Sequence, residues 1–147
     1  MITLQFCGGA QSVTGGNYLI DNGRFKFLVE CGMKQGSEED EKVNYEDFVY
    51  KPEEMQFLIA THAHIDHVGC IPKLVKEGFS GSIYSTEPTK DISRISLEDT
   101  VSVMKENHTD MPPLFEMEDV NATFDVWETV PYDEVIDVNE DVSFRLR

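Results

Sequence analysis

Short apolar runs separated by turn-forming residues occupy the first 30 positions of the chain. Segments 1–6, 17–21 and 25–30 have the length and the β-branched and aromatic content of strands. An Asn-Gly pair separates the last two segments and is a strong signal for a tight β-hairpin. The glycine-rich stretch 7–16 is typical of a loop, and so is the stretch 31–42 that follows the third segment. The pattern therefore predicts three strands, including one hairpin, at the edge of a sheet.

The apolar pattern changes in the middle of the chain. Residues 55–60 (MQFLIA) form an almost continuous apolar run, which is typical of a strand buried on both faces. Segment 68–77 has a helical pattern and is followed by Gly78, a residue type that commonly ends helices. Segment 81–86 is again typical of a strand. Strands first, then alternating helix and strand, predict an α/β layered domain with a mixed β-sheet and flanking helices.

A long helix is predicted from residue 87 to residue 108, because Thr86 can cap it and Pro88 suits its first turn. A shorter helix is expected within 111–127, so that 87–127 is mainly helical and packs on the outside. Apolar residues of the long helix recur at roughly helical spacing, namely Ile92, Ile95, Leu97, Val101 and Met104. The two remaining strand-like segments are 134–138 and 142–147.

Composition narrows the class of protein. With 147 residues and 40% hydrophobic residues, the chain is long and apolar enough for one globular domain with a real core. No apolar run approaches the length of a membrane span, and the N-terminus has no signal-peptide pattern, so we expect a cytoplasmic protein. The three cysteines, Cys7, Cys31 and Cys70, are too widely spaced for a zinc knuckle and are expected to be buried, reduced thiols.

The net charge of −16 does not suit a chain that binds nucleic acid alone, because phosphate contacts depend on Lys and Arg. The acidic residues concentrate in 37–54 and 116–141, where solvated surface is the simpler interpretation.

The segment THAHIDHVG at 61–69 carries the chemistry of the sequence. His62, His64, Asp66 and His67 stand where a buried strand ends and a helix begins, and this edge of an α/β sheet is the usual place for a site. Residues two apart on an extended stretch point the same way, and imidazole and carboxylate suit zinc, iron or manganese. Surface or capping histidines are the alternative, but their density here favours a metal site.

The motif supplies too few ligands for a complete two-metal site. A catalytic zinc takes about three protein ligands, whereas four side chains give about two for each of two ions. The chain has one further histidine, His108, which we expect to be an exposed residue at a helix end rather than a ligand. The sequence therefore predicts half of a dinuclear site.

The pattern H-x-H-x-D-H after a buried strand resembles the signature of the metallo-β-lactamase fold superfamily. FCGGAQSVTGGNYLID, FLVECGMKQG, the segment that begins THAHIDHVG, and DISRISLEDT resemble its RNA-processing branch with the β-CASP insertion. Ribonuclease J-like enzymes and the pre-mRNA 3′-end cleavage endonuclease belong to this branch. The resemblance implies an α/β fold, the αββα sandwich, of which residues 1–147 would be the N-terminal half. The β-CASP cap and the C-terminal motifs, including the last metal histidine, would be absent.

Carried over to this chain, the resemblance implies a site for two zinc ions. His62 and His64 would bind the first ion, and Asp66 and His67 the second. Asp66 would also be catalytic, because it helps to orient the nucleophilic water.

The resemblance also assigns a role to residues outside the motif. Glu30 stands where the family has an aspartate and would have a catalytic role by supporting the histidines through hydrogen bonds. An ordinary carboxylate at a strand end is the alternative. The glycine loop from Gly8 to Gly16 would lie beside the metals, and Thr14 and Asn17 would hold that loop in a structural role.

Three functions remain open at this point. The first is metal-dependent hydrolysis of RNA by a hydroxide activated on two zinc ions, with the missing ligands supplied by the remainder of a longer protein. The second is another hydrolase of the same fold, acting on a thioester or a small phosphodiester. The third is an inactive fragment or interaction module. The expected partners are RNA, the remainder of a longer protein or a second copy of this chain, and the 147 residues alone should show little turnover.

Overall fold

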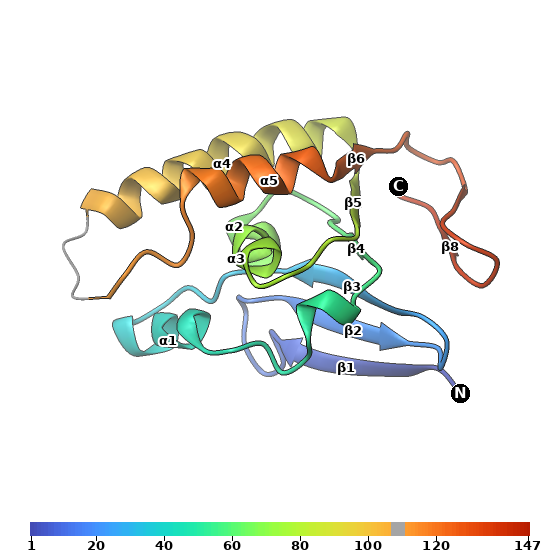
Figure 1. Ribbon diagram of the computed structural model, residues 1–147, viewed down its shortest axis with the longest axis horizontal. Coiled ribbons are helices and arrows are strands. Elements are labelled where there is room, and N and C mark those ends of the chain that lie inside the picture. Colours follow the sequence, from blue (N-terminus) through green and yellow to red (C-terminus); the bar gives the residue numbers. More distant parts are fainter. Residues whose placement is uncertain (107–110) are drawn as a thin grey trace.

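The computed structural model of the protein describes residues 1–106 and 111–147, and it contains one mixed sheet of six strands and a separate pair of short strands (Figure 1). The six strands follow the order of the sequence across the sheet, and the first three are antiparallel while the third to the sixth are parallel. Their bounds are Thr3–Gly8 (β1), Asn17–Asp21 (β2), Lys26–Cys31 (β3), Phe57–Ile59 (β4), Ser82–Ser85 (β5) and Trp127–Thr129 (β6). The predicted mixed α/β fold is confirmed.

Helices and the remaining strands fill the connections. The helices are Glu38–Lys42 (α1), Ile65–Val68 (α2), Ile71–Lys76 (α3), Glu87–Glu106 (α4) and Met117–Asp125 (α5), with 3-10 turns at Val43–Tyr45 and Pro52–Glu54. Strands Ile136–Asp137 (β7) and Ser143–Phe144 (β8) pair antiparallel. The predicted strands at 134–138 and 142–147 therefore shrink to two residues each.

Two other expected elements differ from the structure. The predicted loop after β3 contains α1, because Ser37 and Asp40 form a reciprocal capping box that supports a short helix. The predicted helix 68–77 begins earlier, at Ile65, and is divided by a break around Gly69. A Cβ at Gly69 would lie 2.4 Å from the Ile65 carbonyl oxygen and 2.7 Å from Met33 Cβ, so only glycine fits there. The expected end at Gly78 is found, with φ of +111°.

One face of the sheet is covered by helices α3, α4 and α5, and α4 and α5 lie side by side (Figure 1). Each of the strands β2 to β6 contributes a buried residue to this face, namely Leu19, Leu28, Leu58, Ile83 and Trp127. The helices contribute Leu74, Leu97, Val101, Val120 and Phe124. This is the larger of the two apolar clusters.

The long helix does not bury all the apolar positions that were predicted. Ile92 and Ile95 are 55% and 69% exposed, whereas the buried residues are Thr89, Ser93, Leu97 and Val101. These four positions follow a step of four, so the inward face passes through Ser93 rather than Ile92. A prediction based on the spacing of apolar residues does not detect the small hydroxyl side chains that are buried on that face.

The opposite face of the sheet is lined by Phe27, Phe57 and Ile59. Phe27 and Phe57 stack with ring centroids 4.4 Å apart. Within residues 1–106 and 111–147, the side chains from outside the sheet that pack here come from the C-terminal segment: Val138, Val142, Phe144 and Leu146.

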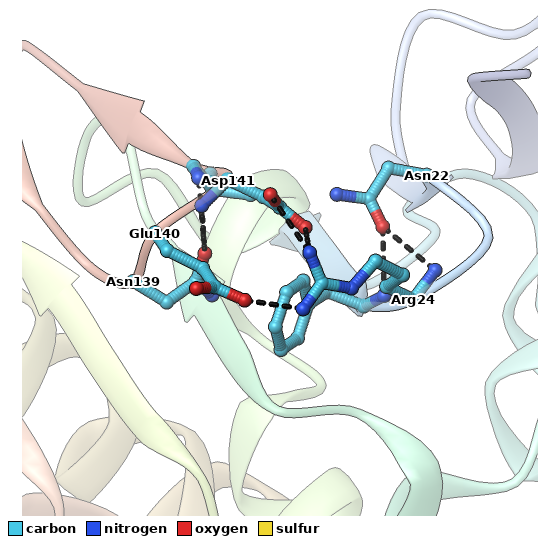
Figure 2. Close-up of polar contacts among 7 residues, drawn as sticks. Asn22, Arg24, Asn139, Glu140 and Asp141 are labelled. Carbon is cyan, nitrogen blue, oxygen red and sulfur yellow. Dashed lines mark hydrogen bonds and ion pairs between the residues drawn. The ribbon is translucent and has the colours of Figure 1, made fainter.

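A polar contact holds this C-terminal segment to the sheet. Figure 2 shows the Arg24 guanidinium, at the β2–β3 turn, between Glu140 and Asp141. The Arg24 Nη1–Asp141 Oδ2 distance is 3.0 Å. The turn itself is fixed by Asn22 Oδ1, which accepts hydrogen bonds from the backbone N–H groups of Arg24 and Phe25. The predicted Asn-Gly hairpin is confirmed.

The cysteines are free thiols, Cys31 and Cys70 buried and Cys7 partly exposed. Burial raises the pKa of the Cys70 thiol to about 12. Among the described helices, none combines the length and the apolar character that a membrane crossing requires.

Candidate metal centre

Two adjacent parallel strands bring the predicted site residues together. β3 and β4 pair in parallel, with Val29 opposite Ile59, so their carboxyl ends meet at one edge of the sheet. Glu30 stands at the end of β3, and the histidine motif follows β4 directly. A hydrogen bond joins the two ends, because the backbone N–H of Thr61 donates to Glu30 Oε1 at 3.0 Å.

The glycine loop packs directly against the motif. The Gly16 N–H donates to the Asp66 carbonyl oxygen at 2.8 Å, and a Cβ at Gly32 would lie only 1.7 Å from that oxygen. Only glycine can therefore occupy position 32 without moving the motif. Thr14 exchanges two hydrogen bonds of 3.0 Å with the backbone of Gln35. The loop lies beside the motif at Gly16, as the sequence predicted. Thr14 has the structural role that was predicted for it.

Asn17 follows Gly16 directly and holds the same end of this loop. Its Nδ2 donates to the Tyr50 hydroxyl at 2.9 Å and approaches Cys31 Sγ at 3.7 Å. Asn17 thus has the structural role that was predicted, and Tyr50 is a partner that the sequence did not indicate.

The imidazoles of His64 and His67 both lie close to that of His62, so the three rings form one group. The ring centroids of His64 and His67 lie 4.7 and 4.0 Å from that of His62. Burial, followed by the neighbouring His67 and His64, lowers the pKa of His62 below its ordinary value. This shift favours the neutral imidazole, which is the form that binds metals. Thr61 Oγ1 lies 3.0 Å from His62 Nδ1 and can fix the ring, a contact that spacing alone did not predict.

The two carboxylates flank His67 on opposite sides. Asp66 Oδ2 lies 3.6 Å from His67 Nε2, and Glu30 Oε2 lies 3.7 Å from His67 Nδ1. The side chain of Glu30 is only 3% exposed, whereas that of Asp66 is 19% exposed. The site thus has a buried side at Glu30 and a more open side at Asp66.

The buried surroundings of Glu30 disfavour the charged form of its carboxyl group. Burial raises the pKa of its carboxyl group to about 7, although hydrogen bonds from Thr61 act in the opposite direction. Glu30 Oε2 and His67 Nδ1 are both buried without a hydrogen-bond partner. Unpartnered buried polar atoms are costly, so these two atoms require a further group between them or a closer approach.

One ligand atom from each of Glu30, His62 and His67 lies within 4.8 Å of the others, a spacing that could hold a metal ion. The structure also places His64 and Asp66 beside this group, so all five predicted site residues gather at one edge of the sheet. His108 lies outside the described residues.

Comparison with known proteins places this arrangement in a family. The model of the metallo-beta-lactamase superfamily domain matches residues 19–144. The chain belongs to the metallo-β-lactamase superfamily. The crystal structure of MEM-A1, a subclass B3 metallo-beta-lactamase isolated from a soil metagenome library, superposes with a TM-score of 0.53 at 16% identity. The superposition covers 93% of this chain and 46% of the MEM-A1 chain. At this low identity, the similarity supports the assignment of the fold alone.

Two curated relatives of this superfamily member share more of its sequence. Ribonuclease TTHA0252 of Thermus thermophilus is 39% identical over 127 residues, which is 86% of this chain and 28% of the relative. Cleavage and polyadenylation specificity factor subunit 3-I of Arabidopsis thaliana is 32% identical over 133 residues, which is 89% of this chain and 19% of the relative. Both belong to the β-CASP branch, so the predicted branch is confirmed.

The metallo-β-lactamase fold implies a bound divalent metal. The residues present fit such an ion, because the donors are imidazoles and carboxylates and two of their atoms are buried without a partner.

Proposed function

We propose that this chain is the N-terminal part of a metal-dependent ribonuclease and carries half of its zinc site. The observation that carries the proposal is the convergence of three histidines and two carboxylates at the ends of β3 and β4. The names of the relatives, a ribonuclease and a cleavage factor, support RNA as the substrate of the complete protein.

Each residue has a proposed task. His62 and His64 hold one zinc ion, and Asp66 and His67 hold the second. Asp66 would also accept a hydrogen bond from the attacking water and so orient it. Zinc bound here supplies Lewis acidity, which acidifies water and offsets negative charge on the phosphoryl oxygens.

Glu30 supports this arrangement from its buried position. Its Oε1 accepts the Thr61 N–H, which ties the end of β4 to β3. Its Oε2 faces His67 Nδ1 and favours the tautomer with a proton on that nitrogen.

The domain is proposed to be completed by residues outside 1–147. The chain spans 28% and 19% of the two curated relatives, and the motif supplies about two ligands for each of two ions. The sheet also exposes Leu4 and Phe6 of β1, at 55% and 59%, where further protein can pack. With a net charge of −16, the basic residues that hold RNA must come largely from that remainder. We place the complete protein in the cytoplasm.

The test is cleavage of a labelled RNA by the complete protein, with zinc present. Changing His62→Ala or Asp66→Asn should lower the rate by at least roughly 100-fold, because each change removes a proposed ligand. Asp91→Asn is the matched control, because Asp91 is an exposed carboxylate on α4. RNA left uncut while a thioester or small phosphodiester is hydrolysed would assign the second kind of hydrolase. No turnover of any of these substrates would assign a non-enzymatic interaction module.

A further inference from the structure

We propose that a groove between the glycine loop and segment 34–50 docks a basic peptide segment with an apolar anchor, presented by a separate protein. The groove encloses about 480 Å³, which is within the usual size range of ligand clefts. Among the described residues that line it, none belongs to the metal motif 61–69. The inference therefore goes beyond the proposed function and does not depend on a bound metal or on RNA cleavage.

Part of the groove surface is apolar and exposed. Val43 and Val49 line the groove and are 44% and 68% exposed. Phe48 and Tyr50 also line it, and their rings stack with centroids 5.3 Å apart. Exposed apolar side chains that gather around a concavity are typical of surfaces that bind another molecule. A leucine or phenylalanine side chain of a partner protein can be buried against them as an anchor.

Polar contacts fix the walls of the groove. The buried Lys73 donates a hydrogen bond to the Glu46 carbonyl oxygen, and its Nζ lies 4.5 Å from the centroid of the Phe48 ring. On the opposite wall, Asn44 accepts the Lys34 N–H at 2.7 Å and donates to the Lys34 carbonyl oxygen at 2.8 Å. A groove that is already formed binds its partner at a lower entropic cost.

The rim of the groove is acidic. Glu39, Glu46 and Asp47 line it, and in the part of the chain that the structure describes none of these three carboxylates has an ion-pair partner. They belong to the run 37–54, which has eight acidic and two basic residues. Carboxylates around an apolar groove favour a partner with lysine or arginine beside its anchor, because opposite charges speed association and select the partner.

Charge also discriminates between possible occupants of the groove. Lys34 and Lys73 line it but already pair at 3.6 Å with Asp40 and Glu77, so they offer little positive charge to an anion. RNA would bring its phosphates to an acidic rim, and a second copy of this chain would bring its own net charge of −16. A basic segment of another protein is the occupant that agrees with this charge.

The experiment measures binding of a fluorescent peptide to the 147-residue chain by fluorescence anisotropy. The peptide carries a Leu-Phe pair flanked on both sides by lysines, and we expect saturable binding at one site. A peptide with Ser-Ser in place of Leu-Phe should bind at least about 10-fold more weakly, because it lacks the anchor. A peptide with glutamates in place of the lysines should show no saturable binding, because the acidic rim repels it.

Variants of the chain locate the binding site. Val49→Ser and Asp47→Lys should each weaken binding by about 3–10-fold. Val135→Ser and Glu134→Lys are the matched controls and should bind as wild type, because both residues are exposed and neither lines the groove. Equal weakening by Asp47→Lys and Glu134→Lys would mean that the peptide follows the overall charge of the chain, and it would overturn the inference.

A second measurement needs no variant. Cys7 lines the groove and is partly exposed, whereas the other two thiols, Cys31 and Cys70, are buried. Saturating peptide should therefore slow alkylation of Cys7 by iodoacetamide by at least about 5-fold. Unchanged alkylation would overturn the inference.

Three further outcomes would assign the groove to another occupant and equally overturn the inference. Displacement of the peptide by a short RNA would assign it to nucleic acid. A dimer of the chain that sedimentation detects and that Val49→Ser dissociates would assign it to a second copy. A complete protein that fails to bind the peptide, although the 147 residues bind it, would assign the groove to the remainder of the same chain.

Discussion

The two faces of the six-stranded sheet are covered to very different extents. On one face, helices α3, α4 and α5 bury residues such as Leu28, Leu58 and Ile83 completely. On the other, within the described residues, side chains of the short C-terminal segment cover Phe27, Phe57 and Ile59, while Leu4 and Phe6 stay exposed. Consecutive residues of β4 therefore belong to two different environments.

This difference indicates which face of the sheet contributes most to the stability of the chain. The helix-covered face has a closed core, in which Leu28, Leu58 and Ile83 are fully buried. The other face has an apolar surface larger than its cover, which is typical of a surface that receives another layer. The candidate metal residues lie at the sheet edge where β3 and β4 end.

The largest expected effect comes from opening the helix-covered face. Leu58 is fully buried at the centre of the sheet, so Leu58→Ala should lower the free energy of unfolding by about 2–5 kcal/mol. That is a large fraction of the roughly 5–15 kcal/mol that holds a typical domain together. Chemical denaturation of the metal-free chain measures it. Ile92→Ala, on the exposed side of α4, serves as the control and should change stability by no more than about 0.5 kcal/mol. Equal losses in both variants would contradict the assignment of Leu58 to the closed core and of Ile92 to the exposed side of α4.

The sequence predicted five of the six strands of the large sheet, β1 to β5, because their pattern is a direct consequence of burial, whereas the three-residue strand β6 was not predicted. The apolar run at 55–60 contains a strand whose three residues are all buried. The pattern failed where polar residues are buried instead. Ser93 lies on the inward face of α4 while Ile92 lies outside, and hydrophobic spacing cannot show that exchange. The short helix α1 was missed as well, since its signal is a capping box rather than an apolar stripe.

The candidate site was predictable only in part, for a geometric reason. Spacing placed His62 and His64 together because they are neighbours in the chain. The approach of Glu30 to His67 depends on β3 lying beside β4 and on the bulge at Glu30, and neither follows from local spacing. Resemblance to the family supplied Glu30, but not its backbone conformation or its unpartnered oxygen.

A smaller effect is expected on the less covered face. Phe144 is half-buried against the sheet, and its ring centroid lies 5.6 Å from that of Tyr84. Phe144→Ala should cost about 1–2 kcal/mol, less than a fully buried aromatic residue, because part of its surface already meets water. Denaturation gives the free energy, and limited proteolysis should show faster cleavage in 130–147. Val135→Ala, at an exposed position, is the control. A loss as large as that of Leu58→Ala would mean that the two faces of the sheet contribute equally to stability.

The smallest effect concerns the ion pairs that attach the C-terminal hairpin. The side chains of Arg24 and Glu140 are 61% and 67% exposed, so water and salt weaken their attraction. Arg24→Ala should therefore cost at most about 1 kcal/mol at low ionic strength, and the difference from wild type should shrink toward zero in about 1 M NaCl. Arg145→Ala is the matched control, because Arg145 is an exposed arginine in the same C-terminal segment. If the Arg24→Ala loss persists in high salt, the arginine acts through the contact of its guanidinium with the Phe25 ring rather than through its ion pairs. The C-terminal hairpin would then be held to the sheet by apolar contacts alone. Burial of apolar surface would in that case stabilise the cover of this face, as it does on the helix-covered face.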